Sequence, residues 1–124
     1  SSHRLADRRL LRPSDFDGEA FISLPAESIN RAEIDRSLRD SSRVLSIETP
    51  YATTICTMVG KGLGVSIVNP MVSRALRMPE LREIPLSRKV EFHSYAVTSD
   101  HFPTGALARR MAECVRRTFE GLAA

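Results

Sequence analysis

The sequence predicts an α/β fold built on a doubly wound, mostly parallel sheet. Short apolar, β-branched runs alternate along the chain with amphipathic segments of helical spacing, which is typical of parallel strands covered by helices on both faces. The clearest example is residues 49–70, where a helix, a glycine-rich turn, a buried strand and another helix start follow one another. The 124 residues, 42% of them hydrophobic and 27% charged, suit one compact domain with its own core.

The first predicted elements are short. Residues 3–11 are basic with scattered leucines, and we expect an entering strand or extended arm rather than a packed element. Residues 13–18, reading PSDFDG, indicate a turn or a single helical turn with Phe16 as its apolar anchor. Residues 20–24, reading AFISL, predict a short buried strand that ends before Pro25.

A helix and a second strand follow. Asn30 and Glu33 have the spacing of a capping box, which predicts a helix from this point to about Asp40. Residues 44–48, reading VLSIE, predict a strand that runs directly into Thr49.

The central helix is predicted to begin at Thr49 and Pro50. A threonine hydroxyl can accept an orphan N–H there, and a proline at the first helical position has no N–H to leave unpaired. The helix ends near Val59 in a glycine-rich turn, since glycine tolerates the positive φ of a helix end. Residues 65–68 are a β-branched run typical of a strand buried on both faces.

Three elements are predicted between this strand and the last helix. Asn69, which precedes a proline, repeats the capping signal for a helix over 70–76. Residues 81–86 alternate well enough for a strand, although Pro85 places it at a sheet edge. Residues 91–98 alternate clearly between two faces and predict another strand.

The last predicted helix begins at Pro103 and Thr104. Its large apolar residues fall on one stripe, with arginines on the opposite face: Leu107, Met111, Val115, Phe119 and Leu122. Each such side chain contributes about 1.5–3 kcal/mol when buried, so this stripe needs a cover. We therefore expect the chain to self-associate through it.

Charge and cysteine usage exclude several classes of protein. The formal charge of +3 comes from 18 Lys and Arg against 15 Asp and Glu, too mild and mixed to indicate nucleic-acid binding without a groove-reading motif. No apolar run reaches the roughly 20 residues of a membrane helix, and no signal peptide opens the chain. Cys56 and Cys114 have no partner at metal or redox spacing, so we expect two free, buried thiols in a reducing cytoplasm.

Catalytic and metal-binding patterns are scarce. His3, His93 and His101 stand in no nucleophile, zinc or phosphoryl-transfer motif. The glycines at 60–64 follow a helix rather than a strand, the reverse of a phosphate-binding loop. We predict a non-enzymatic protein without cofactor or metal. The alternative is a small α/β enzyme that uses Asp100 and His101.

Small hydroxyls and backbone N–H groups gather where the predicted strands end. Ser23 closes the first strand, Ser28 lies in the following loop, and Thr49 and Tyr51 stand at the start of the central helix. Ligands of open α/β sheets bind outside the carboxyl ends of the strands, and a helix N-terminus favours an anionic group. The pattern predicts a site for a carboxylate-bearing small molecule. The alternative is that Thr49 and Asn30 only cap their own helices.

In order and spacing, the motifs of the chain resemble the effector-binding region of LysR-type transcriptional regulators. The motifs are LRPSDFDGEAFISL, a helix ending in ID, a strand closing in IET, MVGKGLGVSIVNP, a late strand and PTGALARRM. The likeness is greatest to the subgroup that controls lysine, diaminopimelate or opine metabolism, and IETPYATTICTMVGKGLGVSIVNP carries most of it.

The resemblance implies a fold similar to type II periplasmic binding proteins, with an effector between two α/β subdomains. Residues 1–99 would form the second subdomain, and residues 100–124 the helix that returns to a missing first subdomain. The effector, an amino acid or opine-like carboxylate, would contact six residues: Ser23, Pro25, Ser28, Thr49, Pro50 and Tyr51. The protein would be cytoplasmic and reach DNA only through a missing N-terminal domain. The alternative is a periplasmic-type solute-binding domain, which needs an export signal.

Overall fold

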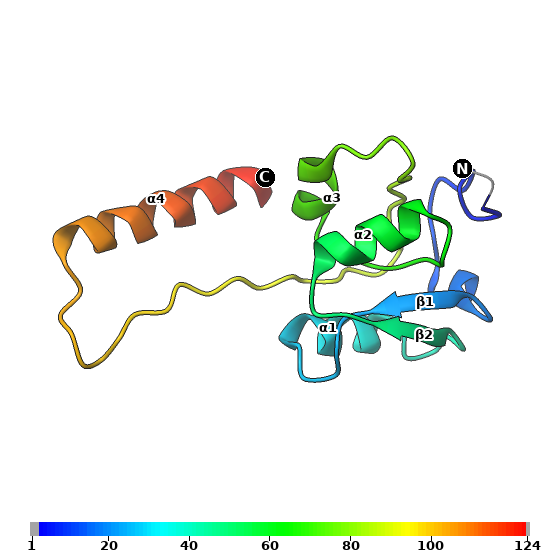
Figure 1. The fold of residues 1–124 in the computed structure, drawn as a ribbon, viewed down its shortest axis with the longest axis horizontal. Coiled ribbons are helices and arrows are strands. Elements are labelled where there is room, and N and C mark those ends of the chain that lie inside the picture. The colour runs from blue at the N-terminus through cyan, green and yellow to red at the C-terminus, as the bar shows by residue number, and fades with distance from the viewer. Residues whose placement is uncertain (1–2, 124) are drawn as a thin grey trace. The chain divides into compact units, whose positions relative to one another are not determined.

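The computed structural model describes residues 3–123, and the side chains as far as residue 121. The chain divides into two compact units, and the boundary along the sequence lies between His93 and Ser94. The first unit contains a 3-10 helix and five regular elements (Figure 1): η1 Pro13–Phe16, β1 Ala20–Ser23, α1 Ile29–Ser37, β2 Val44–Glu48, α2 Ala52–Gly60 and α3 Pro70–Leu76. The second unit contains one helix, α4 Ala106–Ala123.

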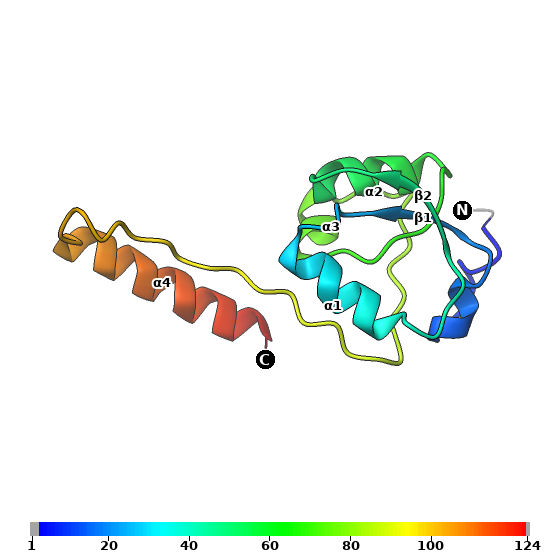
Figure 2. The same ribbon diagram turned by 90° about the horizontal axis from the view of Figure 1, so that it is seen from below.

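The two strands form a parallel sheet that lies between α2 on one side and α1 on the other (Figures 1 and 2). Neighbouring strand residues point to opposite faces, and both Phe21 and Ile22 are fully buried. Helices therefore cover both faces of β1. The predicted α/β class and parallel pairing are confirmed, while the regular sheet among residues 3–123 is limited to two strands.

The run at 65–68 lies beside β1 but pairs with it at one residue only. The Val65 N–H donates to the Ala20 carbonyl and the Val65 carbonyl accepts from the Ile22 N–H, both at 2.9 Å. The next parallel ladder bond would join the Ile67 N–H to the Ile22 carbonyl. Instead, the Ser66 hydroxyl donates a hydrogen bond to the Ile22 carbonyl at 2.6 Å. The predicted strand is thus an extended segment with a single bridge.

The strands predicted at 81–86 and 91–98 do not form among the described residues. Only Leu86 pairs, through an isolated bridge with Leu11, because Pro85 offers a carbonyl but no N–H to a ladder. Residues 91–98 alternate in sequence but are not assigned to a strand, and the amide of His93 donates to the Asn30 side chain.

Two helices begin away from the predicted capping residues. The Thr49 N–H donates to the Ser23 carbonyl at 2.9 Å, which extends the β1–β2 pairing and delays α2 until Ala52, with Tyr51 as its N-cap. Helix α1 begins next to the predicted position, at Ile29, but Ser28 is its N-cap, so Asn30 lies in the first turn instead of capping it, and the helix ends at Ser37 rather than near Asp40.

Other local predictions hold. Asn69 caps α3 by accepting from the Met71 N–H at 3.0 Å, and a proline follows it as expected. The turn after α2 places Gly62 at a φ of +79°, where a Cβ would be strained. Phe16 anchors the N-terminal turn with 2% exposure. One local prediction is wrong: residues 3–11, expected as an entering strand or extended arm rather than a packed element, contribute buried Leu5 to the same apolar cluster as Phe16.

Helix α4 presents an apolar stripe within its own unit. Leu107, Met111, Val115 and Phe119 are 82%, 65%, 44% and 39% exposed, while the side chain of Leu122 lies outside the described residues. Salt bridges of Arg116 and Arg117 to Glu113 line another face of the helix. The prediction of two buried thiols holds for Cys56, which is buried, and is wrong for Cys114, which is exposed.

Candidate functional site

The carboxyl ends of β1 and β2 lie side by side. Their register pairs Ser23, the last residue of β1, with Glu48, the last residue of β2. An extra residue in β2, Ser46, bulges the ladder and donates its hydroxyl to the Phe21 carbonyl at 3.3 Å. The Thr49 N–H also donates to the Ser23 carbonyl. The segments that follow β1 and β2 therefore begin side by side.

Two helices start from this edge without a side-chain cap. Ser28 precedes α1 and Tyr51 precedes α2, and neither side chain accepts a hydrogen bond from the first helical turn. Helix α3 differs, because Asn69 caps it. The first N–H groups of α1 and α2 are therefore available to a ligand oxygen, and the helix dipole favours an anion there. The N–H donors at this edge are of the kind that suits an anionic group.

Arg31 ties this edge together. Its Nη1 donates to the Leu24 carbonyl at 2.7 Å and to the Glu48 carboxylate at 2.9 Å, and its Nε donates to Asp35 at 2.9 and 3.0 Å. Only 9% of the side chain is exposed. Burial lowers the pKa of Arg31, but the bonds to Glu48 and Asp35 outweigh it, so that its pKa lies above the ordinary value. Arg31 stays charged and joins α1 to both strand ends.

A second arginine supports the sheet beneath this edge. Arg43 pairs with Asp35, and its guanidinium lies over the Phe21 ring, 4.8 Å from the ring centroid. Sequence reasoning did not identify either Arg31 or Arg43. The four-residue spacing of Arg31 and Asp35 was a readable sign of a helical ion pair, whereas the link to Glu48 depends on the fold.

The structure brings some of the six predicted contact residues together. Ser23 is 1% exposed, and its hydroxyl donates to the Leu24 carbonyl at 2.8 Å. Ser23 therefore has a structural position at the end of β1 and is not open to solvent. Thr49 is partly buried next to it, and its hydroxyl lies 3.5 Å from the Tyr51 N–H. Tyr51 is 67% exposed and free to contact a ligand. Partly buried Pro25 and Ser28 and exposed Pro50 complete the set.

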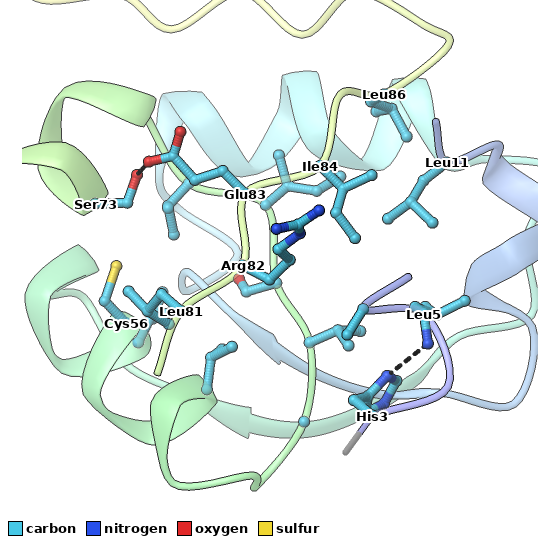
Figure 3. A pocket seen from close by; sticks show the side chains of 18 of the residues that line it. His3, Leu5, Leu11, Cys56, Ser73, Leu81, Arg82, Glu83, Ile84 and Leu86 are labelled. Atoms are coloured by element: carbon cyan, nitrogen blue, oxygen red, sulfur yellow. Dashed lines mark hydrogen bonds between the residues drawn. The ribbon is translucent and has the colours of Figure 1, made fainter. Parts of the chain in front are cut away.

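A large hollow of the first unit lies elsewhere. It has a volume of about 1260 Å³ and none of the six predicted residues lines it. Figure 3 shows Leu5, Leu11, Leu81 and Ile84 around this opening. At one end, the Ser73 hydroxyl donates to Glu83 at 2.5 Å.

Cys56 also borders this hollow. Burial, followed by the charge of Glu83, raises the pKa of its thiol. A thiol with a raised pKa is a poor nucleophile at neutral pH, so the position of Cys56 does not indicate a reactive cysteine.

The described residues contain no further constellation that indicates chemistry. No group of three or more His, Cys, Asp or Glu within residues 3–123 could hold a metal ion. Asp100 and His101 are both exposed, and no hydrogen bond or ion pair joins them. Over the same residues, no helix combines the length and apolar character that crossing a bilayer requires.

Comparison with known proteins gives a consistent result. The family model described as LysR substrate binding domain matches residues 1–120. The Transcriptional activator protein LysR of Escherichia coli (strain K12) is 32% identical over 109 residues, which are 86% of this chain and 35% of that protein. The Regulatory protein NocR of Agrobacterium tumefaciens (strain T37) is 36% identical over 74 residues, 57% of this chain and 24% of that protein. The chain thus spans about a third or less of each relative.

Proposed function

Because the chain belongs to the LysR substrate-binding domain family, we propose that it is the effector-sensing part of a bacterial LysR-type transcriptional regulator. It binds a small carboxylate or amino-acid-like ligand at the carboxyl ends of β1 and β2. The observation that carries this proposal is the pair of helices that start without a side-chain cap at two strand ends held in register.

Each group at the edge has a role in this proposal. The free N–H groups at the start of α2 receive the ligand carboxylate, and those of α1 offer a second set of donors. Thr49 and Ser28 add hydroxyls, while Pro25, Pro50 and Tyr51 bound the ligand from the loop side. Ser23 fixes the end of β1 from its buried position. Glu48 is 49% exposed in its side chain and can accept from a ligand ammonium group while Arg31 holds it in place.

Regulation follows from differential binding. We assign residues 1–99 to one effector-binding subdomain and residues 100–124 to a helix that returns to another. We expect the two subdomains to adopt two arrangements in equilibrium. A ligand that contacts both subdomains can shift this equilibrium only by the difference between its binding free energies to the two arrangements. DNA contacts belong to a part of the regulator outside this chain, the protein is cytoplasmic, and no reaction is catalysed.

Calorimetric titration of the longer polypeptide with amino acids and opines tests the proposal. A helix N-terminus contributes about 0.3–1 kcal/mol to anion binding, and up to ~2 kcal/mol when partly buried. Thr49→Val and Tyr51→Ala should therefore weaken the affinity several-fold. Thr57→Val, farther along α2, where the hydroxyl bonds only to the Thr53 carbonyl, should leave it unchanged. Absence of any binding in a folded protein would rule out the site.

A further inference from the structure

A second hollow of the first unit lies at the C-terminal end of α1, where the chain that follows α3 passes the helix (Figure 2). It has a volume of about 310 Å³, and two stretches far apart in the sequence line it. Six residues form this lining: Glu33, Arg36, Ser37, Arg39, Arg88 and Lys89. Four of them are cations and one is an acid, so the hollow is positively charged.

Hydrogen bonds hold the two stretches together. Arg88 donates from Nη1 to the Ser37 carbonyl at 3.3 Å and from Nη2 to the Asp40 carboxylate at 2.8 Å. Within α1, Arg36 donates to Glu33 at 2.9 Å. The hollow therefore depends on the folded arrangement of both stretches and is not a feature of either one alone.

The simplest explanation for cations at this place is the negative end of the α1 dipole. Arg88 fits that explanation, because it bonds to a carbonyl of the last turn. The other three cations of the lining bond to no helix carbonyl among the described residues. Arg39 has a single ion contact in that part of the chain, at 3.9 Å from Asp40, which is too long for a hydrogen bond. The helix end therefore accounts for one of the four cations.

These side chains keep donors for a ligand. A guanidinium has five N–H donors, of which Arg36 uses one, and the Lys89 ammonium has three, of which one faces Glu91 at 2.8 Å. Arg36, Arg39 and Lys89 are 69%, 72% and 82% exposed, so their ion pairs are weak and an added anion can share the cations. The buried hydroxyl of Ser37 also has no hydrogen-bond partner in the described chain.

Size and charge indicate the class of ligand. Ligand pockets measure roughly 300–1,000 Å³, and the hollow is at the lower end of this range, which favours a small molecule over a polymer. A phosphate group carries a charge of about −1.5 to −2 and three acceptor oxygens. Guanidinium groups match these oxygens in paired hydrogen bonds. A single carboxylate has one charge and two oxygens, so it can engage fewer of the four cations.

We propose that this hollow is a second ligand site of the first unit, for a small molecule that carries a phosphate group. Arg36 and Arg39 bind the phosphate oxygens from the α1 side, and Arg88 and Lys89 bind them from the other stretch. Glu33 orients Arg36 and does not contact the ligand. The nine residues of α1 place this site about 14 Å from the proposed effector edge, at the other end of the helix. The proposal does not depend on where the effector binds.

Calorimetric titration of the longer polypeptide tests the site with two probes, glycerol 3-phosphate and inorganic phosphate. We expect phosphate binding, and Arg39→Gln should weaken it about five- to ten-fold through the loss of charge-assisted hydrogen bonds. Arg9→Gln removes an exposed arginine that does not line the hollow, and it should leave the affinity unchanged. Tighter binding of glycerol 3-phosphate would support a phosphate ester as the ligand, and equal binding of both probes would support free phosphate.

Three results would overturn the proposal. Absence of binding by either probe to the folded protein would show that the cations only face solvent. Equal losses for Arg39→Gln and Arg9→Gln would show a diffuse attraction to positive charge. A loss with Thr49→Val but none with Arg39→Gln would place the phosphate at the effector edge instead. Circular dichroism checks that Arg39→Gln, which changes an exposed side chain, keeps the fold.

Discussion

Replacing Arg31 by alanine should loosen the whole edge on which the proposed effector site is built. Arg31 connects three elements through four hydrogen bonds: to Leu24 after β1, to Glu48 at the end of β2, and twice to Asp35 within α1. No other side chain joins both strand ends among the described residues. The variant removes these bonds and the buried stem of the arginine together.

The magnitude follows from how exposed the partners are. Breaking a fully buried ion pair costs about 3–5 kcal/mol because a charge is left without a partner. Here Asp35 and Glu48 are 44% and 49% exposed, so water can solvate both carboxylates once Arg31 is gone. The free energy of unfolding should therefore fall by about 2–3 kcal/mol. Arg31→Met, which keeps an apolar stem over the same surface, should lose about half as much.

Urea unfolding followed by circular dichroism measures this loss. Arg36→Ala is the matched control, because Arg36 lies on the same helix and pairs with Glu33, but its side chain is 69% exposed. Its loss should stay within about 0.5 kcal/mol. Equal losses for Arg31→Ala and Arg36→Ala would refute the view that Arg31 holds the strand ends together. Effector affinity should fall only in the Arg31 variants.

Three further changes test other parts of the structure. Gly64→Ala places a Cβ 2.4 Å from the Ala20 carbonyl oxygen and should cost about 1–3 kcal/mol in urea unfolding, whereas Gly105→Ala, with open space around it, should change stability by less than about 0.5 kcal/mol. Iodoacetamide should modify exposed Cys114 well before buried Cys56, whose thiol pKa burial raises; equal rates in the native protein would contradict this environment. Met111→Gln should weaken self-association in sedimentation at least ten-fold and Arg117→Gln should not, while a wild-type chain that stays monomeric at all concentrations would show that the α4 stripe does not mediate it.

Features that depend on a few neighbouring residues could be predicted from the sequence. The strand at 44–48 and the helix at 70–76 have the predicted bounds, because β-branched runs and the Asn69–Pro70 cap act locally. The turn after α2 and the anchoring of Phe16 also follow from short-range chemistry. In the site, the positions of Ser23 and Thr49 at adjacent strand ends could be predicted from strand order alone.

Features that depend on distant partners could not be predicted. Thr49 has the sequence of a helix cap, but a bond to the Ser23 carbonyl draws it into the sheet. Residues 91–98 alternate like a strand but are not assigned to one, because strand formation depends on neighbouring chain more than on the local pattern. Cys114 lies beside an apolar stripe of α4, and its exposure does not follow from that local pattern. The bond of Arg31 to Glu48 spans 17 positions and appears only once the sheet is assembled.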